Sequence, residues 1–298
     1  MKVFWKPIIA VLVFILMELL VGGILGAIGH AAHFGTSGMA AILALGIIIS
    51  GILTVFIMNR IKMIKWRVAN PLTIGWKKAP LAIVGALMGI IAANLLNEKL
   101  NLPNLIEAEM SEMCHTFLGV LAIAVIGPII EEIVFREGII GYMIRRGQHR
   151  WVAILFSAIM FGIIHLNPAQ IPFAFIMGII LGVVYVRSHS IVLTSIIHIL
   201  NNTIAVIEIL ALGDRANDIS YAELLGGPGI AWGYIIICSG LCALFLKEFW
   251  KQYHRKYSAS DEEEHHHHHH HHHKKVEGAV NDVQAQVEAN IEQEPTEI

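Results

Sequence analysis

Charged residues are scarce in this chain, and this scarcity decides its class. Asp, Glu, Lys and Arg make up 15% of the residues, whereas soluble domains usually carry about 25%. Hydrophobic residues make up 56%, and the mean hydropathy is +0.65. These values exclude a soluble globular domain. They predict an integral membrane protein whose solvent is the lipid bilayer.

Cysteine is also rare. Cys114, Cys238 and Cys242 form no disulfide framework and no metal-binding motif. Cys238 and Cys242 share one face of an apolar helix, where we interpret them as small packing residues. The sequence therefore gives no sign of cross-linking by cysteine.

Several catalytic motifs are missing. There is no H-E-x-x-H zinc motif and no G-x-S-x-G serine motif. The single Gly-Asp pair, Gly213–Asp214, lies in a loop and has no second aspartate within a membrane span. No glycine-rich phosphate loop occurs, and nothing indicates a nucleic-acid partner. These absences exclude zincin-type, serine-hydrolase and nucleotide-binding sites of the usual kinds.

Long apolar runs are what the sequence does contain. A membrane-spanning helix needs about 20 mostly apolar residues, and by this criterion the fold is an all-α membrane helix bundle of about eight spans. The fifth and sixth are on the short side. In order, the predicted spans are 7–28, 39–58, 79–97, 116–144, 151–166, 171–186, 191–212 and 230–246.

Basic residues predict the orientation of these spans. Lys and Arg gather in alternate connections, and the connections between them are acidic or uncharged. Because cytoplasmic loops are the ones rich in Lys and Arg, both termini are predicted to be cytoplasmic. The basic stretch 62–78 is interleaved with apolar residues and is either an interfacial helix or a positively charged loop.

The composition changes after the last span. We predict a transmembrane domain over 1–256, with its functional core at about 114–212, and a cytoplasmic low-complexity tail over 257–298. The tail contains an unbroken histidine run, 265–273. Such a run is a metal-binding tract, an engineered tag or a solvated spacer, and the sequence does not choose among them.

Among the polar residues inside the predicted spans, six form the candidate set: Glu131, Glu132, Arg136, His165, His198 and Asn202. An ionisable side chain at the centre of a membrane helix costs roughly 2.5–3.5 kcal/mol, so such residues are usually functional. Arg136 follows Glu132 by one helical turn, which predicts an ion pair. Glu131 has no local partner, so it is the candidate general base or acid. Glu137 is expected to be a further ion-pair partner of Arg136.

The depths of these residues agree. Glu131 precedes Arg145, and His165 follows Trp151, by the same number of residues. At 1.5 Å per residue, both lie roughly 20 Å from the cytoplasmic end of their helices. Asn202 has a similar depth, and His198 lies one turn below it on the same face. Each residue alone has a structural explanation, but the shared layer predicts one site.

At these residues the chain resembles the CPBP family, which comprises CAAX proteases and bacteriocin-processing enzymes and is also called the Abi family. The three family motifs occur in order: E-E-x-x-x-R at 131–136, F-x-x-x-H at 161–165 and H-x-x-x-N at 198–202. Glu137 stands where the family often has glycine. The resemblance covers roughly 118–206. It implies an intramembrane endopeptidase of bacterial style, located in the cell membrane, acting on a peptide or membrane protein with or without a lipid modification.

The resemblance implies roles for the six residues. Glu131 with His165 would activate a water molecule, His198 and Asn202 would stabilise the oxyanion, and Glu132 with Arg136 would hold the site in register. In a second form of the hypothesis, Zn²⁺ is bound by some of Glu131, His165 and His198. Two other functions stay open at this point: a transporter of divalent metal ions or protons, and a non-catalytic bacteriocin-immunity or peptide-binding protein.

Overall fold

The structure is a computed structural model, and it describes residues 2–66, 78–213 and 220–251. Within these ranges the chain is helical and contains no β-strand. The predicted helical membrane bundle is therefore confirmed. The first helices are α1 (Lys2–Ala31), α2 (Thr36–Arg60), α3 (Ala79–Leu100) and the short α4 (Glu107–Cys114).

The second half of the bundle contains α8 (Arg150–Ile164), α9 (Ile171–Ser188), α10 (Ile191–Leu212), the short α11 (Tyr221–Leu224) and a last helix, Pro228–Lys251. Seven segments in the described ranges are long and apolar enough to span a membrane. The predicted fifth span is α8, whose 15 residues fall short of the roughly 20 that a perpendicular span needs.

The chain divides into two units, 1–249 and 250–298. Most of the second unit, including the predicted tail and its histidine run, lies outside the described residues. Most of the basic stretch 62–78 lies outside them too. Its described part, 62–66, is not helical, and it buries Met63 and Ile64. The sidedness of the termini stays a prediction.

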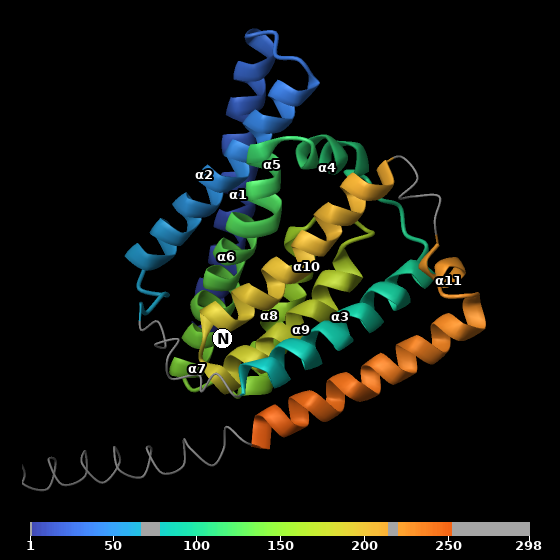
Figure 1. Cartoon of the computed structure of the whole chain (residues 1–298). Coiled ribbons are helices and arrows are strands. Elements are labelled where there is room, and N and C mark those ends of the chain that lie inside the picture. Colours follow the sequence, from blue (N-terminus) through green and yellow to red (C-terminus); the bar gives the residue numbers. More distant parts are fainter. Residues whose placement is uncertain (1, 67–77, 214–219, 252–298) are drawn as a thin grey trace, which may run out of the picture. The chain divides into compact units, whose positions relative to one another are not determined.

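The predicted fourth span, Phe117–Arg145, is not one regular α-helix. It runs through α5 (Phe117–Leu121), the π-helix η2 (Ala122–Ile126), α6 (Gly127–Glu132), the π-helix η3 (Ile133–Gly141) and α7 (Tyr142–Arg145). Figure 1 shows these pieces following one another as one rod between the other helices. Segments with π geometry often occur at functional sites.

The sequence explains the first wide turn. Pro128 has no N–H group, so it cannot donate the hydrogen bond that continues a regular α-helix. Directly before it, the Gly127 N–H bonds to the Ala122 carbonyl, five residues earlier. A side chain at Gly127 would come within 2.6 Å of that carbonyl oxygen. The Gly-Pro pair therefore permits the wide turn that leads into Glu131 and Glu132.

Candidate functional site

The centre of the candidate site is a buried ion pair on the fourth span. Arg136 Nε donates to Glu132 Oε2 at 2.8 Å, and Arg136 Nη2 donates to Glu132 Oε1 at 3.1 Å. Both side chains are 0% exposed. The predicted pair is thus present in its two-pronged form, which is the stronger geometry for Arg and carboxylate. It keeps a negative charge inside the bundle at a fixed position.

His198 on α10 joins this pair. Its Nδ1 lies 3.0 Å from Glu132 Oε1. An ionised carboxylate can only accept hydrogen bonds, so Nδ1 of His198 carries the proton. The other ring nitrogen, Nε2, then faces Glu131, whose Oε2 is 3.6 Å away. The imidazole is therefore oriented by one glutamate and directed at the other.

Glu131 differs from Glu132 in its surroundings. Its side chain is 21% exposed, whereas Glu132 is fully buried. The distance of 3.6 Å to His198 is longer than a direct hydrogen bond. Glu131 is therefore the carboxylate of the site that is open to another molecule, such as water.

Phe161 on α8 links the two histidines. The His165 ring meets the Phe161 ring edge-on at 5.1 Å, and the His198 ring does so at 5.9 Å. The Arg136 guanidinium lies 5.1 Å from the centre of the same ring. His165 Nδ1 donates to the Phe161 carbonyl at 2.8 Å, because a carbonyl oxygen can only accept. In neutral His165 the lone pair is therefore on Nε2.

Asn202 has a definite structural contact. Its Nδ2 donates to the carbonyl of Ile123 at 2.9 Å, within η2, and its Oδ1 accepts from Asn201. Asn202 thus ties α10 to the first wide turn of the fourth span. One amide N–H stays for other partners, and the oxyanion role of Asn202 stays a prediction.

The zinc hypothesis can be compared with this arrangement. Among the described residues, no three His, Cys, Asp or Glu side chains come together as a metal-binding group. Glu131 and His198 face each other, but the Nδ1 of His198 bonds to Glu132, and His165 bonds through Nδ1 to Phe161. The three residues therefore do not form a ready ligand set for a zinc ion.

Glu137 is the one polar residue whose predicted partner was wrong. It was expected to pair with Arg136, but it accepts from Arg145 Nη1 at 2.6 Å and from the Tyr185 hydroxyl. Its carboxylate also accepts from the backbone N–H of Lys65 at 3.1 Å. Arg136 is already committed to Glu132. Glu137 therefore belongs to a second cluster, near the end of the span that carries Arg145.

Sequence reasoning missed Glu18 on α1. This half-buried carboxylate is close enough to Glu131 for their charges to interact. The signal was available, because Glu18 is the one charged residue in the predicted first span, 7–28.

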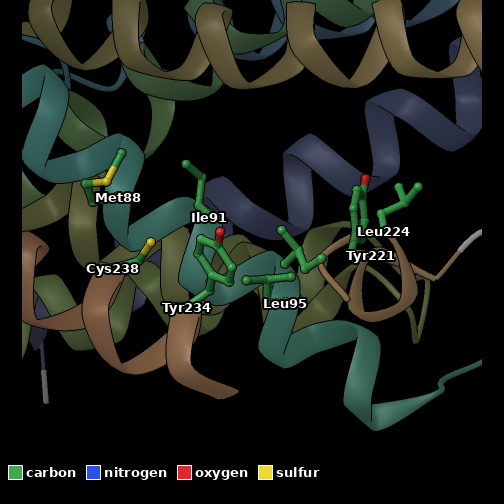
Figure 2. A pocket seen from close by; sticks show the side chains of 8 residues that line it. Met88, Ile91, Leu95, Tyr221, Leu224, Tyr234 and Cys238 are labelled. Atoms are coloured by element: carbon green, nitrogen blue, oxygen red, sulfur yellow. The ribbon is translucent and has the colours of Figure 1, made fainter. Parts of the chain in front are cut away.

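An apolar pocket of about 480 Å³ lies elsewhere, between α3, α11 and the last helix (Figure 2). Met88, Ile91 and Leu95 of α3 face Tyr221 and Leu224 of α11, and Tyr234 and Cys238 of the last helix. No residue of the candidate site lines it. The pocket is lined mainly by apolar side chains and lies apart from the buried acids and imidazoles.

Fold and site together define a polytopic helical membrane protein with acids and imidazoles buried in its bundle. Residues 114–204 match the family model described as "Type II CAAX prenyl endopeptidase Rce1-like". This match confirms the resemblance drawn from the three motifs. The matched segment contains all six predicted site residues.

A curated relative agrees with this assignment. A "Putative membrane peptidase YdiL" from Bacillus subtilis (strain 168) is 31% identical over 90 residues, which is 30% of this chain and 36% of that protein. The chain thus spans about a third of the length of the curated relative it matches. No solved structure matches the chain significantly. The comparisons support a membrane peptidase as the general class.

Proposed function

We propose that this chain is an intramembrane endopeptidase that uses Glu131 to activate the attacking water. The observation that carries the proposal is the connected series Glu131, His198, Glu132 and Arg136 inside the helix bundle. A carboxylate open to another molecule lies beside an imidazole that a second carboxylate orients. The substrate is a peptide or a membrane-protein segment, with or without a lipid modification.

The reaction begins with a water molecule beside Glu131. The carboxylate accepts one proton from the water as its oxygen adds to the carbonyl carbon of the scissile bond. The same proton then passes to the leaving nitrogen as the C–N bond breaks. His165 has its Nε2 lone pair available and would help to hold the water, because its Nδ1 is occupied by Phe161. The net result is one new carboxyl group and one new amine.

In its protonated form, His198 would stabilise the oxyanion. Its Nδ1 proton is held by Glu132, so only Nε2 can donate to the substrate. Removing one preorganised donor of this kind typically costs about 10²–10³ in rate. The remaining N–H of Asn202 is the second candidate donor.

The Glu132–Arg136 pair would act as the support of the site. It is bidentate and fully buried, so it fixes the carboxylate oxygen that His198 contacts. The edge of Phe161 packs against both imidazoles and the guanidinium. Displacing this support would turn the His198 ring away from Glu131 without touching the reacting atoms.

The proposal is tested by comparing peptide termini from cells that make the wild type, Glu131→Gln or Glu109→Gln. Glu109 is an exposed carboxylate on α4 and serves as the matched control. New termini in the membrane and secreted fractions are expected with the wild type and the control, and not with Glu131→Gln. Identical termini in all three, with each protein folded and equally abundant, would overturn the proposal.

A further inference from the structure

The first helix carries a carboxylate that the proposed mechanism does not use. Glu18 is half-buried in α1, and it forms no hydrogen bond or ion pair with another described residue. An ionisable group without a partner inside a membrane helix is costly and usually marks a function. The role of Glu18 therefore depends on which group it faces.

Two contacts between α1 and the fourth span show which group Glu18 faces. The Lys6 ammonium lies 5.9 Å from the centre of the Tyr142 ring, and the Phe14 and Phe135 rings meet at 6.2 Å. Moving forward along α1 from Lys6 to Phe14 thus means moving backward along the other helix. The two helices are antiparallel here.

The same register continues to the two glutamates. One further turn along α1 leads from Phe14 to Glu18, and one turn back along the fourth span leads from Phe135 to Glu131. Residues one turn apart share a helix face, so Glu18 and Glu131 face each other. The charge interaction between these two groups agrees with this register.

Two carboxylates that face each other in a low-dielectric site do not both ionise easily, and they hold a proton between them. Glu131 must be the ionised member if it is to act as a base. The neutral member is then Glu18, whose hydroxyl can donate a hydrogen bond. Such a bond would occupy one oxygen of Glu131 and leave the other to the water.

We propose that Glu18 is a positioning residue: in its neutral form it donates a hydrogen bond to Glu131 and fixes the carboxylate oxygen that receives the proton from the attacking water. The catalytic part of this inference rests on the proposed peptidase function. The pairing of Glu18 with Glu131 does not depend on that function.

The catalytic part is tested with Glu18→Gln and Glu18→Leu, purified at full length and reconstituted into liposomes. The probe is a quenched fluorescent peptide carrying the cleavage sequence found by the terminus comparison. Gln keeps a donor, so kcat is expected to stay within a few-fold of the wild type. Leu removes a hydrogen bond to a charged group, so kcat should fall about tenfold or more, with KM unchanged. Leu19→Ala is the control, because the Leu19 side chain is 64% exposed.

Two outcomes would overturn the positioning role. One is a wild-type kcat in Glu18→Leu. The other is an equal loss of kcat in Glu18→Gln and Glu18→Leu, because the amide would then have failed to replace the proposed donor.

The pairing itself is tested by infrared spectroscopy of the same proteins, without substrate. The carbonyl band of a neutral carboxyl group is expected in the wild type, absent in Glu18→Gln and shifted in Glu131→Gln. A band that is unchanged in both variants would refute the pairing. This measurement separates the two proposals. If the chain pairs Glu18 with Glu131 but is not a peptidase, the band still responds to both substitutions. If Glu18 does not pair with Glu131, the expected changes of the band are not seen.

Discussion

Arg136→Met should be one of the most destabilising single substitutions in the bundle. The change removes the guanidinium from a pair in which both side chains are 0% exposed. Met has a similar volume, so little packing is lost, although the cation–π contact of the guanidinium with Phe161 is removed. Glu132 would stay in the interior with His198 as its remaining partner. Removing one partner of a buried pair costs about 3–5 kcal/mol, because a buried charge is left uncompensated.

The size of the effect depends on His198. If its ring takes up a proton, it replaces part of the lost charge compensation, so we expect the lower end of the range, about 3 kcal/mol. The double variant Glu132→Gln/Arg136→Met leaves no charge, and its amide oxygen can still accept from His198. It should recover most of the loss, because neutral replacements of buried pairs are often tolerated.

The measurement is the free energy of unfolding of the purified protein in mixed detergent micelles, followed by tryptophan fluorescence. Arg145→Met is the matched control: Arg145 is 28% exposed, and its partner Glu137 keeps the Tyr185 hydroxyl and the Lys65 N–H. It should lose clearly less stability than Arg136→Met. A loss below about 1 kcal/mol for Arg136→Met, the value of an exposed pair, would refute the reasoning. So would a double variant as unstable as the single.

Three further outcomes follow from the structure. Gly178→Ala should lose about 1–3 kcal/mol of unfolding free energy from overpacking, because its new methyl group would lie 2.9 Å from the Ala158 backbone; Gly23→Ala, which meets nothing within 4 Å, should not. Ser157→Ala should lose about 1 kcal/mol in the same assay, because the hydroxyl donates to the Phe135 carbonyl at 3.0 Å. Peptide cleavage by metal-stripped protein should survive a chelator, and loss of activity that zinc restores would contradict the metal-free route.

Much of the bundle could be predicted from composition, because apolar runs of sufficient length have few alternatives to a membrane helix. The Glu132–Arg136 pair could be predicted too, since one helical turn separates the two residues. The π-helical turns could not, because hydrophobic periodicity over a few residues does not distinguish them from α-helix. The Gly127–Pro128 pair was the local signal.

The partners of Glu137 and Glu18 show a different limit. Glu137 pairs across two turns with Arg145 and across the bundle with Tyr185, and neither contact follows a local spacing rule. Glu18 faces Glu131 from a helix more than a hundred residues earlier. Such contacts depend on how the helices pack, so a sequence pattern can identify the residues but cannot predict which of them are partners.

The part of the chain that matches the family does not enclose the site alone. Residues 114–204 carry Glu131, the buried ion pair and both imidazoles. Yet Phe14 of α1 covers Phe135, and by the same register Glu18 covers one side of Glu131. Without α1, that side of the base would lose the carboxyl group proposed to pair with it. The first helix is therefore part of the site's chemistry as well as its scaffold, although the family match begins far beyond it.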